Sequence, residues 1–339
     1  MRILAFFALF IFFAGLIFSE SKKNNPYQTL NGKIFGTYYT VKIRTDKKDT
    51  RLPKIISNEL NNVNSQMSVF DLSSEISQIN NSPANQWIEL SKDMQYILKN
   101  SYNIYKISDG AFDPTAGKLI DLWGFGTKGR IEKEPNEADI YDTLSLTGFD
   151  KIEFSEDFSR LKKQFDDVTI NLSAIAKGYG VDKLSELLKG LGYNDFIIEI
   201  GGEVIAYGNK SDKIKGWNIG IVKPSEKSNE TAFIVGIKDY AVATSGDYRN
   251  FFYVGEKKYS HTIDTRTGYP VKNNLLSVTV FHQKCMIADG LATAIMSMGE
   301  KEGLEFAEFN DLAVFMFVKT EDNKIKNIVS NKAKKLIEQ

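Results

Sequence analysis

The stretch MIADGLATAIMSMG, residues 286–299, predicts a buried helix, because nearly every position is apolar or small. Its polar exceptions are Asp289, Thr293 and Ser297, which lie four residues apart and therefore form one stripe along the helix. A helix without a broad polar face has no side that is suited to solvent exposure, so we expect the rest of the fold to pack around it.

The polar stripe allows two interpretations of Asp289 and Thr293. A buried carboxylate is costly unless a cation or a hydrogen-bond donor meets it. In one interpretation, the Asp289 carboxylate and the Thr293 hydroxyl bind a hard cation such as Mg²⁺, with substrate phosphates and water completing the ligands. In the other, Asp289 pairs with a buried lysine or arginine, and the Thr293 hydroxyl bonds back to its own helix. The helix alone leaves both open.

The composition excludes several classes of protein. The 339 residues carry 43 Lys and Arg against 43 Asp and Glu, and this zero net charge argues against general nucleic-acid binding. Cys285 is the single cysteine, which excludes an intrachain disulfide and a cysteine-rich zinc site. The length permits one large domain or two lobes that share a cleft.

The N-terminus has the pattern of a targeting segment. Arg2 precedes an apolar run at residues 3–18, which is shorter than the roughly 20 residues a spanning helix prefers, and a polar stretch follows. Residues 1–23 are therefore expected to be a signal peptide or an N-terminal anchor, and residues 24–339 the folded domain. We expect an exported protein, periplasmic or on the outer face of the cytoplasmic membrane. No cysteine closely follows the run, so a lipoprotein is not expected.

Two loops have compositions that suit ligand binding. Residues 110–126, GAFDPTAGKLIDLWGFG, mix glycine with aromatic residues, which fits either a wall against a flat ligand or a buried structural loop. Residues 171–182, NLSAIAKGYGVD, lead from a predicted strand into a helix, whose first N–H groups suit phosphate. Lys177 falls in the first turn, where a cation is unfavourable for the helix dipole. An anionic ligand therefore explains this lysine better than helix stability does.

The order of predicted elements favours the α+β class over alternating β and α units. The charged segment 127–142 is expected to be an exposed excursion. Apolar spacing predicts helices at residues 53–65, 73–79, 91–109, 286–299 and 332–337, and a further helix that begins within 171–182 and ends at residue 190. It predicts hairpins or strands at residues 30–45, 151–165, 196–207, 217–221, 233–244, 276–281 and 312–329.

Eight segments together resemble the FAD:protein FMN transferase (ApbE) family. They are GTYYTV (36–41), MSVFDLSSEISQIN (67–80), GAFDPTAGKLIDLWGFG (110–126), NLSAIAKGYGVD (171–182), EIGGEV (199–204), ATSGDYRNFF (243–252), HTIDTRTGYPV (261–271) and ADGLATA (288–294). They follow the family's order and span nearly all of the chain after residue 23. The resemblance implies an ApbE-like, T-fold-related architecture of mixed sheet and helices, with two lobes and the FAD site in the cleft between them.

The resemblance also implies an activity. The family uses Mg²⁺ to transfer the FMN moiety of FAD to a serine or threonine hydroxyl of a target protein, releasing AMP. Asp289, Thr293 and the carbonyl of Ala174 take the positions of the family's metal ligands. The residues at FAD-contacting positions are Phe35, Phe70, Ala111, Phe112, Asp113, Asn171, Lys177 and Ile263. The implied acceptor is a subunit of a membrane redox complex, such as a sodium-pumping or Rnf-type complex.

A hydroxyl nucleophile needs a base within reach. The chain has two histidines, and the family implies His261 as the base, with an imidazole that is able to accept a proton near neutral pH. His282 ends a predicted strand and is expected to be structural. Asp264 is the second candidate base, and its alternative roles are to orient His261 or to bind a second metal.

Four positions depart from the family's pattern. Phe70 replaces a frequent tyrosine, which keeps the ring but loses the hydroxyl. Asn171 replaces a frequent aspartate, and Ala292 a frequent acid, which makes a second metal less expected. Thr265 replaces the usual proline of the D-P-x-T-G loop.

Two other functions remain open. One is a Mg²⁺-dependent FAD pyrophosphatase, in which water replaces the acceptor hydroxyl and FMN and AMP are released. Phe70 argues against it, because relatives with that activity carry asparagine there. The other is an exported protein that binds FAD without turnover. The presence of Ala174, His261, Asp289 and Thr293 favours an enzyme.

Overall fold

The computed structural model describes residues 26–224, 230–247 and 251–337. The predicted signal peptide or anchor at residues 1–23 lies outside these ranges. Within them, no helix is both long enough and apolar enough to cross a bilayer.

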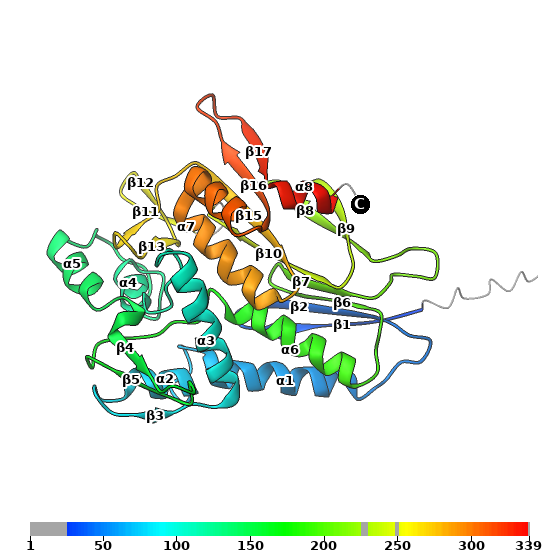
Figure 1. The fold of residues 1–339 in the computed structure, drawn as a ribbon, viewed down its shortest axis with the longest axis horizontal. Helices are drawn as coiled ribbons and strands as arrows, with labels where there is room; N and C mark the ends of the chain where they lie inside the picture. Colours follow the sequence, from blue (N-terminus) through cyan, green and yellow to red (C-terminus); the bar gives the residue numbers. More distant parts are fainter. Residues whose placement is uncertain (1–25, 225–229, 248–250, 338–339) are drawn as a thin grey trace, which may run out of the picture.

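One large antiparallel sheet forms the centre of the fold (Figure 1). Each of its strands is paired antiparallel with its neighbours. In spatial order the strands are β1 (Tyr27–Ile34), β2 (Thr37–Arg44), β6 (Phe196–Ile200), β7 (Glu203–Tyr207), β10 (Tyr240–Gly246), β15 (Leu275–His282), β16 (Ala313–Lys319) and β17 (Ile325–Val329). The antiparallel pairing confirms the predicted α+β class, because parallel βαβ crossovers would have produced a parallel sheet.

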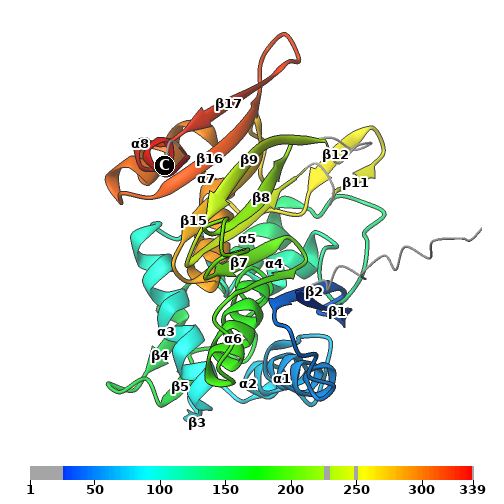
Figure 2. The ribbon, with the colours of Figure 1, turned by 90° about the vertical axis from the view of Figure 1, so that its right-hand side faces the viewer.

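Two helices cover one face of this sheet. Helix α6 (Ala176–Gly190) packs beside α7 (Cys285–Phe309), and α7 lies on β10 and β15. The helices α1 (Leu52–Met67) and α3 (Lys92–Ile107) pack outside α6 and α7 respectively (Figures 1 and 2). The first part of α7, residues 285–299, is thus almost entirely buried, as its apolar sequence predicts, whereas the part after Gly299 exposes residues such as Phe309.

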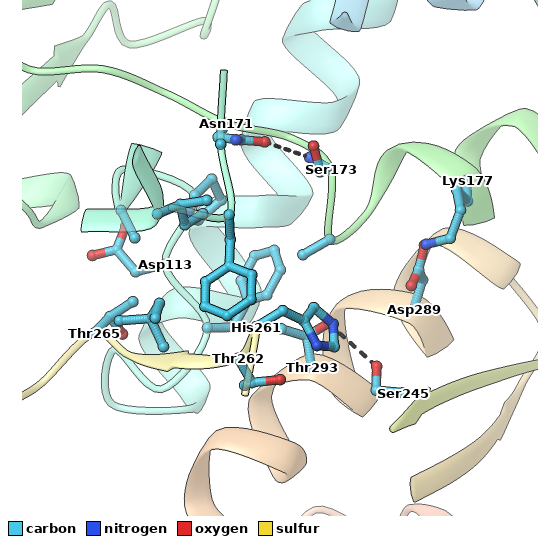
Figure 3. Close-up of a pocket in the computed structure, with 18 of the residues that line it drawn as sticks. Asp113, Asn171, Ser173, Lys177, Ser245, His261, Thr262, Thr265, Asp289 and Thr293 are labelled. Carbon is cyan, nitrogen blue, oxygen red and sulfur yellow. Dashed lines mark hydrogen bonds and ion pairs between the residues drawn. The ribbon is translucent and has the colours of Figure 1, made fainter. Parts of the chain in front are cut away.

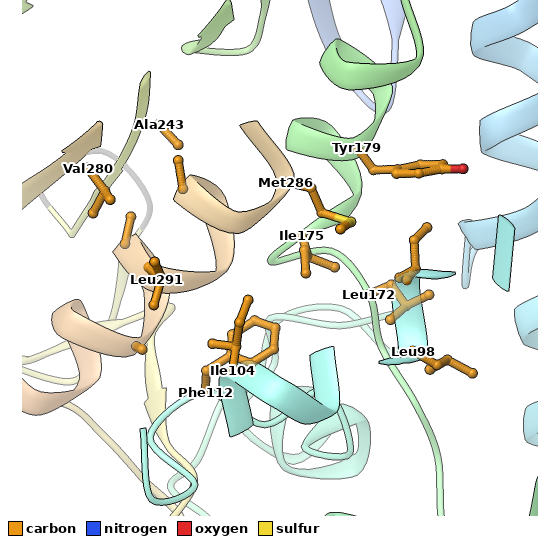
Figure 4. Packing of buried hydrophobic residues seen from close by; sticks show 14 of the residues in the cluster. Leu98, Ile104, Phe112, Leu172, Ile175, Tyr179, Ala243, Val280, Met286 and Leu291 are labelled. Atoms are coloured by element: carbon orange, nitrogen blue, oxygen red, sulfur yellow. The ribbon is translucent and has the colours of Figure 1, made fainter. Parts of the chain in front are cut away.

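The core around α7 draws side chains from several elements. Figure 4 shows Met286 and Leu291 of α7 packed among Ile175 beside α6, Ile104 of α3 and Val280 of β15. All five are fully or almost fully buried. This cluster holds the helix that carries the predicted metal ligands in a fixed position against its neighbours.

Two contacts fix the junction of α6 and α7. A Cβ on Gly178 would lie 2.5 Å from the carbonyl oxygen of Cys285, so only glycine permits this approach of the two helices. The Asp182 carboxylate on α6 accepts hydrogen bonds from the backbone N–H groups of Cys285 and Met286, at 2.9 and 3.0 Å. Asp182 therefore caps the start of α7 from a neighbouring helix.

Smaller elements cover the remaining surfaces. The hairpin β8 (Trp217–Val222) and β9 (Thr231–Ile237) packs with α8 (Asn331–Ile337) in a cluster on the other face of the sheet. The others are α2 (Glu75–Asn81), α4 (Gly117–Leu122), α5 (Glu137–Ser145), the 3₁₀ helix η1 (Phe149–Lys151), β3 (Ile88–Glu89), β4 (Ile152–Phe154), β5 (Arg160–Lys163), β11 (Phe251–Val254), β12 (Lys257–Ser260), β13 (Ile263–Asp264) and β14 (Tyr269–Pro270).

Three local predictions differ from the structure. The segment 127–142 contains the start of α5, which Asn136 caps by accepting a hydrogen bond from the backbone N–H of Asp139. The strand expected before α6 is reduced to a single bridge between Ala116 and Thr169. Helix α7 continues ten residues beyond its expected end, across a break at Gly299, whose φ of 83° lies in the left-handed region.

Candidate active site

A cavity of about 380 Å³ opens beside α7. Its walls come from the loop before α4, the loop before α6, the end of β10, the segment 261–265 and the first half of α7. Eleven of the residues predicted at the site line it: Phe70, Ala111, Phe112, Asp113, Asn171, Ala174, Lys177, His261, Ile263, Asp289 and Thr293. The sheet and the two central helices thus bring together segments that are far apart in the sequence.

A buried cluster of charges lies at one end of the cavity. The Lys177 ammonium lies 3.7 Å from Asp289 Oδ2 and 3.4 Å from Glu203 Oε1 (Figure 3 shows the contact with Asp289). Both carboxylates are 2 % exposed. Asp289 Oδ2 also accepts a hydrogen bond from the Gly178 N–H at 3.0 Å. The predicted metal ligand is therefore also the partner of a lysine, as the ion-pair interpretation expects.

The cluster holds two buried carboxyl groups and one ammonium group. Glu203 Oε2 is buried with no hydrogen-bond partner among the described residues. Burial raises the pKa of Glu203 to about 8 and raises the pKa of Asp289 above its ordinary value. Burial lowers the pKa of Lys177, but Asp289 and Glu203 raise it by more, so the lysine stays protonated. A cation bound beside these carboxyl groups would favour their ionised form, because an opposite charge lowers the pKa of a carboxyl group.

The oxygen atoms near the cluster are of the type that Mg²⁺ prefers. Asp289 supplies a carboxylate, Thr293 a hydroxyl and Ala174 a backbone carbonyl, and all three residues line the same cavity. The Thr293 hydroxyl lies 3.5 Å from the hydroxyl of Ser245. This set of oxygen donors, next to the Glu203 Oε2 that is unpartnered within the described residues, fits a divalent cation.

His261 lies on the wall formed by the segment 261–265. Its Nδ1 lies 3.5 Å from Oδ1 of Asp247, and its side chain remains 35 % exposed. The same Asp247 oxygen accepts a hydrogen bond from the Thr262 hydroxyl at 2.8 Å. Burial raises the pKa of Asp247 above its ordinary value. The carboxylate that contacts the predicted base is therefore Asp247.

Asp264 points to a different partner. Its Oδ1 accepts hydrogen bonds from the backbone N–H and the Nε of Arg266, at 3.0 and 3.1 Å, and Arg266 also pairs with Glu302. The carboxylate is taken up by the turn that it begins, and Asp264 does not line the cavity. The expected role of Asp264 in orienting His261 is corrected by this geometry, because Asp247 occupies that place.

Phe35 is the other predicted residue that does not line the cavity. It sits in the turn between β1 and β2, and a Cβ on Gly180 of α6 would lie 2.7 Å from its ring. The ring is therefore packed against the helix. Phe70, in contrast, lies at the cavity with 71 % of its area exposed, which leaves its ring open to a flat ligand.

The glycine-rich loop 110–126 is partly a buried structural loop and partly a wall of the cavity, so both of its predicted roles occur. Trp123 is buried, and its indole N–H donates to the Gly268 carbonyl at 2.8 Å, which is a structural role. Phe125 lines the cavity instead. The Thr265 hydroxyl, at the position of the family's proline, donates to the Gly110 carbonyl. This bond connects two of the loops that line the cavity.

Two further residues escaped the sequence analysis, although their segments were identified. Glu203 belongs to EIGGEV and Asp247 to ATSGDYRNFF. The feature of the sequence that could have identified them is an acidic residue next to the glycine or glycines of each motif. Their roles come from tertiary neighbours, Lys177 for Glu203 and His261 for Asp247.

Comparison with known proteins identifies the family of this chain. A model of the ApbE family matches residues 35–316. The FAD:protein FMN transferase of Haemophilus influenzae is 37 % identical over 331 residues, which cover 95 % of each chain, and that of Vibrio cholerae is 36 % identical over 310 residues, covering 91 % of this chain and 92 % of the relative. The structure of the flavin transferase ApbE from Vibrio cholerae is 35 % identical, with a TM-score of 0.83 over 91 % of this chain and 99 % of that one. The apo flavinyl transferase ApbE of Pseudomonas stutzeri is 32 % identical, also with a TM-score of 0.83, over 92 % and 97 % of the two chains. The chain belongs to the ApbE family.

Proposed function

We propose that this enzyme transfers the FMN moiety of FAD to a serine or threonine hydroxyl of a target protein. The observation that carries the proposal is the meeting of His261, Lys177, Asp289 and Thr293 in one cavity. This set combines a base, a cation for phosphate and oxygen ligands for a metal, which are the parts that substitution at phosphorus requires.

In the proposed reaction, the acceptor oxygen attacks the phosphorus atom of the FMN half of FAD. A new O–P bond forms, the pyrophosphate P–O bond breaks, and AMP leaves. His261 takes the proton of the acceptor hydroxyl. Lys177, in the first turn of α6, lines the cavity, and its ammonium would bind the pyrophosphate.

Asp289, Thr293 and the Ala174 carbonyl would hold Mg²⁺. The ion would supply charge neutralisation at the pyrophosphate oxygens during the transfer. Glu203 keeps the Lys177 ammonium in place through their 3.4 Å contact, whether or not Asp289 is engaged elsewhere. The exposed ring of Phe70 is suited to stack on the isoalloxazine of FAD.

We further propose that the acceptor is a subunit of a membrane redox complex outside the cytoplasm. The support is the apolar run at residues 3–18 after Arg2, which is typical of export. The apolar segment would serve as a signal peptide or as an anchor.

Three products separate the proposed function from its alternatives. Purified protein is incubated with FAD, Mg²⁺ and a candidate acceptor. Flavin bound covalently to the acceptor, with an equal amount of AMP, supports transfer. Free FMN and AMP with an unlabelled acceptor indicate a pyrophosphatase, and binding of FAD without either product indicates a flavin-binding protein.

A further inference from the structure

We propose that Asp247 is a positioning residue that fixes the His261 ring with Nδ1 turned to Asp247 and Nε2 turned to the cavity. The inference rests on the proposed function, in which His261 accepts the proton of the acceptor hydroxyl. It assigns Nε2 as the nitrogen that takes this proton.

The geometry comes from two neighbouring segments. Asp247 follows directly after β10, and its side chain is 15 % exposed. Oδ1 of Asp247 lies 3.5 Å from Nδ1 of His261 and 2.8 Å from the Thr262 hydroxyl. The two nitrogens of an imidazole face in different directions, so a ring that directs Nδ1 to the carboxylate leaves Nε2 for the cavity that His261 lines.

The surroundings keep this carboxylate in one place. The Thr262 and Ser260 hydroxyls donate to Asp247, and Lys258 on β12 is a further charged group that faces it. The Phe125 ring lies edge-on to His261, with their centroids 6.4 Å apart. Several residues of the segment 258–262 thus contact Asp247, and these contacts fix the position of the carboxylate that His261 faces.

The chemical consequence concerns the tautomer of His261. A carboxylate at Nδ1 favours the proton on that nitrogen, so that Nε2 carries the lone pair that accepts the acceptor's proton. Replacing Asp247 by asparagine keeps the size of the side chain but lets its amide donate to Nδ1. This change favours the opposite tautomer, in which Nε2 carries the proton and no longer acts as a base.

The direct test is the tautomer itself, measured by ¹⁵N NMR of the imidazoles. The chain has only two histidines, so a His282→Gln variant assigns the signals. We expect the Nδ1–H tautomer at His261 in the wild type and its loss in Asp247→Asn. The Nε2–H tautomer in the wild type would overturn the inference, whatever the activity of the enzyme.

Transfer assays separate this inference from the proposed function. We expect Asp247→Asn to lower the rate of FMN transfer by about 10–100-fold, the usual effect of losing a partner that orients a functional histidine, with FAD affinity unchanged. In a His261→Ala background, Asp247→Asn should cause no further loss. Asp239→Asn, the same substitution at the residue that precedes β10 and lies outside the cavity, is the matched control and should transfer within a few-fold of wild type.

The outcomes are distinguishable. If His261→Ala is impaired and Asp247→Asn is not, the inference fails while the proposed base stands. If His261→Ala transfers normally, the proposed base itself is wrong. A loss of FAD affinity or of thermal stability in Asp247→Asn that matches its loss of transfer would reduce Asp247 to a structural residue.

Discussion

The ammonium of Lys177 lies 3.7 Å from Oδ2 of Asp289, so α6 presents a cation to the carboxylate that we propose as a metal ligand. Glu203 holds the same ammonium at 3.4 Å. The charge at this end of the cavity is therefore shared by two buried carboxylates and one lysine. A divalent cation and the Lys177 ammonium are able to occupy the cluster together, because Glu203 contacts the ammonium and Asp289 is then available to the divalent cation.

Replacing Lys177 by methionine tests this arrangement. Without the ammonium, Asp289 and Glu203 face each other with no counter-charge, which we expect to lower the free energy of unfolding of the metal-free protein by about 1–3 kcal/mol. Added Mg²⁺ should then raise the melting temperature more in the variant than in the wild type. The control is Lys183→Met, on the same helix but paired with Glu59 and Asp93. An equal Mg²⁺ effect in Lys177→Met and wild type would contradict the shared cluster.

Asp289→Ala is expected to abolish FMN transfer while the fold survives. Lys177 retains Glu203 as its partner, so the substitution leaves no unpaired lysine in the cavity. The variant should also lose the binding of Mg²⁺ that calorimetry measures in the wild type. Ser297→Ala, in the same polar stripe but outside the cavity, is the control. Wild-type turnover by Asp289→Ala would refute the metal assignment.

Phe70→Ala is expected to weaken FAD binding rather than the chemical step. Stacking of aromatic rings contributes about 1 kcal/mol, which corresponds to a rise of roughly fivefold in KM for FAD. Because the ring is 71 % exposed, thermal stability should not change. Leu72→Ala, on the same loop and 83 % exposed, is the control. An unchanged KM for FAD would show that Phe70 does not contact the flavin.

Asp182→Ala tests the junction of α6 and α7. The variant leaves the N–H groups of Cys285 and Met286 without their acceptor, which we expect to cost about 1–3 kcal/mol in denaturant unfolding. Burial raises the pKa of Asp182 from 3.8 to about 6, so the folded protein binds this proton more tightly than the unfolded chain does. The stabilisation by Asp182 is therefore largest below pH 4 and declines as the pH rises to 6.

Asp157→Ala is the control, because the contribution of Asp157 to stability should change with pH in the opposite direction. Hydrogen bonds from Ser155 and Ser159 lower the pKa of Asp157, so its contribution to stability grows as the pH rises from acid toward neutral. The difference in unfolding free energy between wild type and Asp182→Ala should shrink between pH 4 and 6. A difference that grows over this range would contradict the raised pKa of Asp182.

The periodicity of the sequence predicted most of the fold. Alternating residues identified the strands of the main sheet, and the apolar stretch at 286–299 identified α7 as its buried centre. Helix α5 escaped because it is short and three of its nine residues are charged; Ile140 joins the buried cluster of Trp123 only in the tertiary structure. The break at Gly299 depends on one positive φ, which periodicity does not record.

The site was predicted to the extent that it lies in contiguous motifs. Asp289 and Thr293 were found by their shared helix face, which local spacing determines. Glu203 and Asp247 were not found, because each acquires its role from a partner on a distant segment. Asp264 was expected to orient His261 as one of its alternative roles, but its own turn engages the carboxylate.

The most direct test of the account compares FAD affinity and FMN transfer in His261→Ala on one preparation. FAD binding is followed by flavin fluorescence, and transfer by covalent flavin on the acceptor together with released AMP. The wild type should label the acceptor, and His261→Ala should bind FAD normally while transferring roughly 10²–10⁴-fold more slowly, the usual contribution of a general base. Normal transfer by His261→Ala, or free FMN with an unlabelled acceptor in the wild type, would contradict the account.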